Sequence, residues 1–126
     1  MTDPHNWSPT SVWQKVADTG AAGFALQNAT PTILTWNIPN DGGSHVMLFA
    51  MTLHISSAET GGALGLNYTD PGGNANSTVP AAGGAGIGNA RQNNAVPVQA
   101  GTTVTLTQTS ALTAGAAVVW AQIWGT

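Results

Sequence analysis

Turn-forming residues interrupt this sequence roughly every ten residues from Gly20 onward, and the stretches between them are rich in β-branched and aromatic residues. Residues 40–43 and 70–73 are the strongest turn signals, because Asn, Asp and Gly tolerate the backbone conformations that tight turns require. This pattern leaves little room for helices. It predicts an all-β fold, an antiparallel, jelly-roll-like sandwich of about eight strands.

The strands themselves are read from alternating or β-branched apolar runs. We expect them over residues 32–38, 45–57, 63–69, 95–98, 102–109 and 116–124, with a short one within 23–29. Residues 74–95 look irregular apart from a possible edge strand over 78–80 and a glycine-rich loop over 82–88. Residues 11–17 fit a short helix or a short strand, and the pattern does not decide between them.

The first twenty residues differ in composition from the rest of the chain. They contain Trp7, Trp13, Lys15 and two prolines before the regular alternation of strands and turns begins. The sequence therefore predicts two parts, an extended N-terminal arm over residues 1–20 and a sandwich domain over residues 21–126.

Two of the predicted strands are apolar on both faces, whereas a sandwich strand normally has one face toward the core and one toward water. The strand over 102–109 follows the rule, with threonines on one face and Val104 and Leu106 on the other. The strands over 45–57 and 116–124 do not. Their second faces carry Val46, Leu48, Val118, Trp120, Gln122 and Trp124.

A second apolar face needs a cover. Burying the five apolar side chains of this set would contribute on the order of 10 kcal/mol before the costs of association. Charged residues make up 6% of the chain, so electrostatic repulsion between copies is weak. We expect a homo-oligomer whose subunits share these strands; the alternative is that the N-terminal arm, with Trp7 and Trp13, folds over the same patch.

Composition excludes several classes of protein. Two cations, against five acidic residues, cannot neutralise a nucleic-acid backbone. The absence of cysteine excludes a disulfide framework, a thiolate metal site and a cysteine nucleophile. The apolar run over residues 46–51 is far shorter than the roughly 20 residues that span a bilayer. The first residues do not resemble a secretory signal, so we expect synthesis in a cytoplasm and no membrane partner.

No group of residues predicts catalysis. Asp41, Glu59 and Asp70 fall in expected turns, where carboxylates cap backbone N–H groups. Ser44 and His45 are adjacent on a strand and point to opposite faces, so they cannot form a catalytic triad with Asp41.

Metal and phosphate sites are not indicated either. His5, His45 and His54 lack ligand spacing, although His54 on a three-fold axis would be the best placed to bind a metal. Residues 83–88 lack the spacing of a phosphate-binding loop. We expect no catalytic residue, no metal and no cofactor.

Three stretches carry a further signal: TILTWNIPNDG at residues 32–42, LHISSAETGGA at 53–63 and VQAGTTVTLT at 98–107. They resemble small virion proteins of tailed bacteriophages, especially phages of actinobacteria, and the resemblance extends over roughly residues 22–126. In layout it is similar to the trimeric jelly roll of the tumour-necrosis-factor type. The resemblance implies that Trp120, Gln122 and Trp124 lie at or near a three-fold axis.

The resemblance also implies a function. We expect a non-enzymatic homotrimer that decorates the outside of a phage head and binds the major capsid protein, so that the protein is located on the virion. The arm lies outside the resemblance, and we expect it to bind the capsid through Trp7, Val12, Trp13 and Val16. The alternative is a tail or fibre module that recognises a host glycan, for which tryptophan is a common stacking platform.

Overall fold

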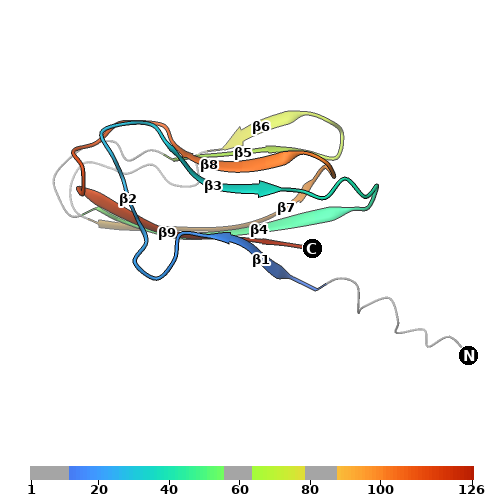
Figure 1. Cartoon of the computed structure of the whole chain (residues 1–126), viewed down its shortest axis with the longest axis horizontal. Coiled ribbons are helices and arrows are strands. Elements are labelled where there is room, and N and C mark those ends of the chain that lie inside the picture. The colour runs from blue at the N-terminus through green and yellow to red at the C-terminus, as the bar shows by residue number, and fades with distance from the viewer. Residues whose placement is uncertain (1–11, 56–63, 79–87) are drawn as a thin grey trace, which may run out of the picture.

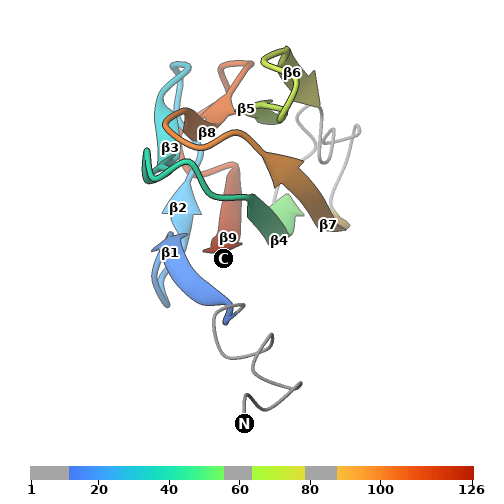
Figure 2. The ribbon, with the colours of Figure 1, turned by 90° about the vertical axis from the view of Figure 1, so that its right-hand side faces the viewer.

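The structure, a computed structural model, describes residues 12–55, 64–78 and 88–126. Within these ranges the chain forms nine strands and no helix, arranged as two antiparallel sheets (Figure 1). Figure 2 shows the two sheets as separate layers, one above the other. The predicted all-β sandwich is confirmed.

The two sheets, here called sheet A and sheet B, differ in size. Sheet A has five strands and consists of β1 (Gln14–Asp18), β2 (Phe24–Ala25), β4 (His45–Ile55), β7 (Gly88–Val98) and β9 (Ala117–Gly125). Sheet B has four strands and consists of β3 (Thr32–Asn37), β5 (Leu64–Thr69), β6 (Ala75–Thr78) and β8 (Thr103–Gln108). In sheet A the order is β1-β9-β4-β7, and β2 also pairs with β9; in sheet B it is β3-β8-β5-β6.

The strand pairs are nested like the two arms of one long hairpin. β5 pairs with β6, β4 with β7, β3 with β8 and β2 with β9, all antiparallel. Within sheet A, β4 also pairs with β9, and within sheet B, β5 also pairs with β8, so that the strand pairs are joined into two sheets. A long hairpin folded over in this way is the jelly-roll topology, so the predicted jelly-roll-like arrangement is confirmed at the level of connectivity.

The core lies between the sheets and is built by strict alternation. In β4, the odd-numbered residues from Met47 to Ile55 are at most 6% exposed, and the even-numbered residues are half-buried. β9 alternates in the same way, with Val119 and Ile123 fully buried. Trp36 crosses from sheet B toward Gly125, where a Cβ atom would overlap the indole ring. The predicted inward faces of both strands are correct.

The sequence-based reading of residues 74–95 as irregular was wrong for residues 75–78 and 88–95. Ala75–Thr78 forms β6, and β7 begins at Gly88 and continues to Val98. The residues of β7 up to Asn94 are mainly polar and show no apolar alternation. This strand forms because every residue of β7 is in register with one of β4, from Gly88 opposite Ile55 to Val98 opposite His45. Tertiary pairing therefore overrides local propensity here.

The undecided segment at residues 11–17 is resolved as a strand. Gln14–Asp18 forms β1, which pairs with β9 through Gln14 opposite Gly125 and Asp18 opposite Gln122. The later part of the predicted arm is thus an edge strand of sheet A. Trp7, Glu59 and residues 79–87, which include most of the glycine-rich segment, lie outside the described residues.

Candidate interaction surface

The face of sheet A turned away from sheet B carries the predicted contact residues. The register of β4 and β9 places Leu48 opposite Trp124, and it places Gln122 and Trp120 opposite Ala50 and Thr52. We call this surface the outer apolar face and define it by Val46, Leu48, Val118, Trp120, Gln122 and Trp124. In one chain Trp120 is 38% exposed, Gln122 is exposed and the other four are half-buried.

Part of this face is covered by the chain's own loop between β1 and β2. The Trp120 indole N–H donates to the Ala21 carbonyl at 3.1 Å, and Thr19 and Ala121 exchange two hydrogen bonds of 3.1 Å. Gly23, with φ of 75°, packs so closely that a Cβ atom would lie 2.8 Å from Val118 Cγ1. This loop therefore covers Val118 and one side of Trp120, while Trp13 remains 40% exposed.

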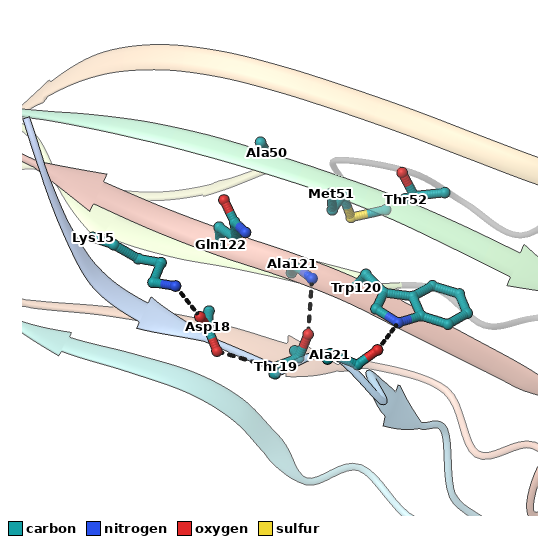
Figure 3. Close-up of a pocket in the computed structure, with 11 residues that line it drawn as sticks. Lys15, Asp18, Thr19, Ala21, Ala50, Met51, Thr52, Trp120, Ala121 and Gln122 are labelled. Carbon is teal, nitrogen blue, oxygen red and sulfur yellow. Dashed lines mark hydrogen bonds and ion pairs between the residues drawn. The ribbon is translucent and has the colours of Figure 1, made fainter.

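A hollow of about 570 Å³ opens on the same face, between β1 and its following loop on one side and β4 and β9 on the other (Figure 3). Trp120 and Gln122 border it from β9, and Thr52 borders it from β4. At its edge Lys15 Nζ and Asp18 Oδ2 form an ion pair of 2.6 Å. The hydrogen bond from Lys15, together with that from the Gly20 N–H, lowers the pKa of the Asp18 carboxyl.

Sequence reasoning missed both the loop and this ion pair. Asp18 and Gly20 did carry a local signal, because an Asp side chain two residues before a Gly typically accepts the glycine N–H. The structure shows that bond, from Gly20 N to Asp18 Oδ1 at 2.7 Å. What the sequence could not indicate is that the resulting turn lies against Trp120, since the two are a hundred residues apart.

The predicted capsid-binding residues of the arm separate into two groups. Val12 is 59% exposed and Trp13 is 40% exposed, immediately before β1. Val16 is half-buried and packs against the core of its own chain. Of the described residues in the predicted set, only Val12 and Trp13 therefore have substantial surface to offer a partner.

His45 forms an arrangement that the sequence did not predict. It is 8% exposed, with Nε2 2.9 Å from Asp41 Oδ1 and Nδ1 2.7 Å from the Thr126 carbonyl oxygen. Both partners are acceptors, so the doubly protonated ring satisfies both and the pKa of His45 is raised, first by Asp41 and then by Thr126. Because both ring nitrogens have these partners, His45 does not activate Ser44, in agreement with the rejected triad.

The described carboxylates act in turns. Asp41 accepts the Gly43 N–H at 2.9 Å, and Asp70 accepts the N–H groups of Gly72 and Asn74 at 3.0 Å, as expected for both. Across the described ranges, no group of three or more His, Cys, Asp or Glu side chains is placed to hold a metal ion. Likewise, the described part of the chain has no helix of the length and apolarity needed to cross a membrane.

Comparison with known proteins gives matches in structure only. No protein-family profile and no curated protein sequence matches the chain. A chain in the structure of infectious bursal disease virus, Gt strain, is similar with 16% identity and a TM-score of 0.49, covering 94% of this chain and 32% of the viral one. The Gx strain gives 14% identity and 0.44, covering 90% and 32%. This chain thus spans about a third of those chains, and with both TM-scores below 0.5 neither match bears on its function.

Proposed function

We propose that this protein is a non-enzymatic virion protein, a homotrimer that decorates the outer surface of a phage head. The observation that carries the proposal is the outer apolar face. Leu48, Trp120 and Trp124 lie together on two adjacent strands whose opposite faces already fill the core. An apolar patch of this kind on a chain with few charges is typical of a subunit interface.

The resemblance of residues 32–42, 53–63 and 98–107 to phage virion proteins supplies the virion context. The trimeric jelly roll of that family supports three copies, with β9 near the axis. In this arrangement the six residues of the outer apolar face are buried between subunits. Three copies of the N-terminal arm then extend from one trimer.

The capsid contact is assigned to the segment before β1, with Trp7 as its apolar anchor. A decoration protein binds a surface that repeats many times, and three linked arms multiply a weak contact through effective concentration. Val16 takes no part, because it packs on its own core. The partner is the major capsid protein.

The test separates assembly from attachment. Light scattering of the full-length protein measures the mass of the assembly, for which we expect three times 12.7 kDa. A variant that lacks residues 1–11 retains β1 and should keep that mass, but it should no longer co-sediment with capsids. The matched point variant is Trp7→Ala, with Trp36 left intact as the fluorescent reporter of folding.

Two results would count against the proposal. A full-length protein that remains at 12.7 kDa in dilute buffer would show that no trimer forms. If the truncated protein binds capsids as well as the full-length chain does, the arm is not the part that attaches the protein to the capsid.

A glycan-binding module is the second candidate, and the hollow beside Trp120 favours it. An exposed indole next to Gln122, Thr52 and the Lys15–Asp18 pair combines a stacking surface with hydrogen-bonding groups. This candidate requires a saccharide affinity that is lost in Trp120→Ala. Absence of binding on a glycan array, together with binding to capsids, favours decoration.

A further inference from the structure

We infer that His45, the first residue of β4, is a pH-dependent latch that holds Thr126 in place while its ring carries two protons and releases it when one proton is lost. The latch consists of His45, Asp41 and Thr126, which meet at one end of the sandwich. It is a property of the folded chain and does not depend on the proposed trimer, although it lies beside one end of the outer apolar face.

The ring of His45 lies between two hydrogen-bond acceptors. Nε2 is 2.9 Å from a carboxylate oxygen of Asp41, and Nδ1 is 2.7 Å from the main-chain oxygen of Thr126. The side chain is buried, so water has little access to either ring nitrogen. The imidazolium form has two N–H groups, whereas neutral imidazole has one N–H and one bare nitrogen. Both contacts of His45 are therefore satisfied together only while the ring is doubly protonated.

The contact that opens in the neutral ring is the one to Thr126. Asp41 is fixed independently of His45, because its Oδ1 also accepts the Gly43 N–H at 2.9 Å. Asp41 also contributes more than Thr126 to the raised pKa of His45, so the remaining proton stays on Nε2. Nδ1 then turns a lone pair toward the Thr126 oxygen, and two lone pairs at 2.7 Å repel each other.

Thr126 lies one residue beyond β9 and is bound to β4 by a pair of hydrogen bonds. Its N–H donates to the Val46 carbonyl at 3.1 Å, and its hydroxyl oxygen accepts the Val46 N–H at 3.0 Å. These bonds place Thr126 beside Val46, two residues before Leu48 on the outer apolar face. When His45 lets go, Thr126 keeps two neutral bonds at a strand end, where chains open most easily. The expected result is a mobile Thr126 and a Val46 with less cover.

Other titratable groups on the surrounding elements do not account for such a transition. Lys15 and Asp18 form an ion pair of 2.6 Å with each other. His54 lies nine residues along β4 from His45, or about 30 Å. Arg91 lies seven residues along β7 from the residue opposite His45, or about 24 Å. The charged and titratable side chains on or next to the neighbouring strands are Lys15, Asp18, Asp41, His54, Tyr68, Asp70 and Arg91.

The experiment follows the ring and Thr126 in one sample of the full-length protein labelled with ¹³C and ¹⁵N. NMR titrates the His45 ring through its carbon-bound protons and ring nitrogens, and relaxation gives the order parameter of the Thr126 methyl group at each pH. We expect a midpoint above the ordinary value of about 6.5 and a neutral ring protonated on Nε2. At the same midpoint the Thr126 order parameter should fall by roughly a third, the difference between rigid and flexible groups.

Thr19 provides a matched control within the same molecule. Its N–H donates to the Ala121 carbonyl and its Oγ1 accepts the Ala121 N–H, both at 3.1 Å, which is the same pair of bonds that Thr126 makes with Val46. His45 takes no part in the Thr19 pair. The Thr19 methyl group should therefore stay rigid through the titration of His45.

Two variants assign the effect to its groups. Asp41→Asn removes the charge that favours the imidazolium, so the midpoint should move to lower pH. His45→Asn should abolish the pH dependence at Thr126. A Thr126 methyl group that stays rigid after the ring is neutral, or that loosens together with Thr19, overturns the inference, and so does a midpoint that Asp41→Asn leaves in place. Light scattering of the same sample tests the trimer separately, because a monomer with a working latch contradicts the proposed function alone.

Discussion

The two sheets of this sandwich both bury their inner faces in the core, but their outer faces carry different kinds of side chain. On sheet B the outer face is rich in threonine and asparagine side chains, several of which bond one another: Asn67 donates to Thr105 at 3.3 Å, and Thr103 donates to Asn37 at 3.0 Å. On sheet A the corresponding positions of β4 and β9 carry valine, leucine and tryptophan beside Ala50, Thr52, His54 and Gln122. Sheet B therefore presents hydrogen-bonded polar side chains on its outer side, whereas sheet A presents apolar side chains that the loop between β1 and β2 covers in part.

In the proposed trimer, this difference separates the residues that form the core from the residues that form the interface between subunits. Either outer face would allow the same core, since Val104 and Leu106 of β8 are as deeply buried as Val119 and Ile123 of β9. The apolar residues on the outside of sheet A are not part of that core, although Val118 and Trp120 also pack against the loop between β1 and β2. Their physical effect is to favour contact with another surface.

The largest expected effect comes from placing a charge on the outer face of sheet A. Leu48→Lys puts three cations into the proposed interface and should raise the dissociation constant of the trimer by about 100-fold or more, because an unpaired charge would be buried. Sedimentation equilibrium measures this constant.

The matched substitution on the other sheet is Thr105→Lys. It should leave the mass of the assembly unchanged and lower the unfolding midpoint only slightly, because it removes one hydrogen bond, from Asn67 to Thr105, on a face that lies outside the core. Equal weakening of the trimer by both lysines would show that the two faces do not differ in the proposed way.

An intermediate effect is expected at Gln108, a polar residue on the inner side of sheet B. Gln108 is 1% exposed; its amide N–H group donates to the carbonyls of Gln27 and Ser110 at 2.6 and 2.7 Å, and its oxygen accepts the Gln27 N–H at 2.9 Å. Gln108→Leu keeps the volume but leaves these backbone groups unpaired. We expect a loss of about 1–3 kcal/mol in the free energy of unfolding.

Urea denaturation measures this loss, with Thr103→Val as the control, since it removes a single exposed hydrogen bond and should change stability by less than about 0.5 kcal/mol. The trimer mass should stay the same in both variants. A change in assembly without a change in stability at Gln108 would contradict the separation of the inner and outer faces.

The smallest effect concerns pH. Because the pKa of His45 is raised in the folded state, chiefly by Asp41, its contribution is complete below its ordinary value of about 6.5 and is lost as the pH rises through the raised value. The pKa of Asp41 is lowered, chiefly by the bond with His45, so its contribution is lost as the pH falls from about 4. Thermal stability should be highest between these limits.

Melting curves from pH 3 to pH 9 measure this profile. The effect is modest, because Asp41 is half exposed and salt screens the pair. His45→Asn should flatten the alkaline side of the profile. If the wild-type melting temperature rises steadily from pH 6 to pH 9, the protonated state of His45 does not stabilise the fold.

The strand alternation was predictable where burial produces a period of two. The sequence placed Met47, Phe49 and Leu53 inside and Val46 and Leu48 outside, and the structure agrees. It also indicated the outward position of Trp120 and the turn roles of Asp41 and Asp70. These features depend on neighbours in the sequence, which local patterns report well.

Features that depend on distant partners were not predictable. β7 has a polar sequence and becomes a strand through its pairing with β4. The ring of His45 is held by Thr126, eighty-one residues further on, and the loop over Trp120 comes from the other end of the chain. No local pattern records such contacts, so the hollow beside Trp120 emerges only from the folded chain.

The central position of β9 has a consequence for biosynthesis. This strand follows the other eight in the chain, yet it pairs with β1, β2 and β4 and joins the two halves of sheet A. A ribosome-bound chain that lacks β9 has β4 and β7 but no surface that carries Trp120 and Trp124. The outer apolar face is therefore complete only once β9 has paired with β4, the same step that joins the two halves of sheet A.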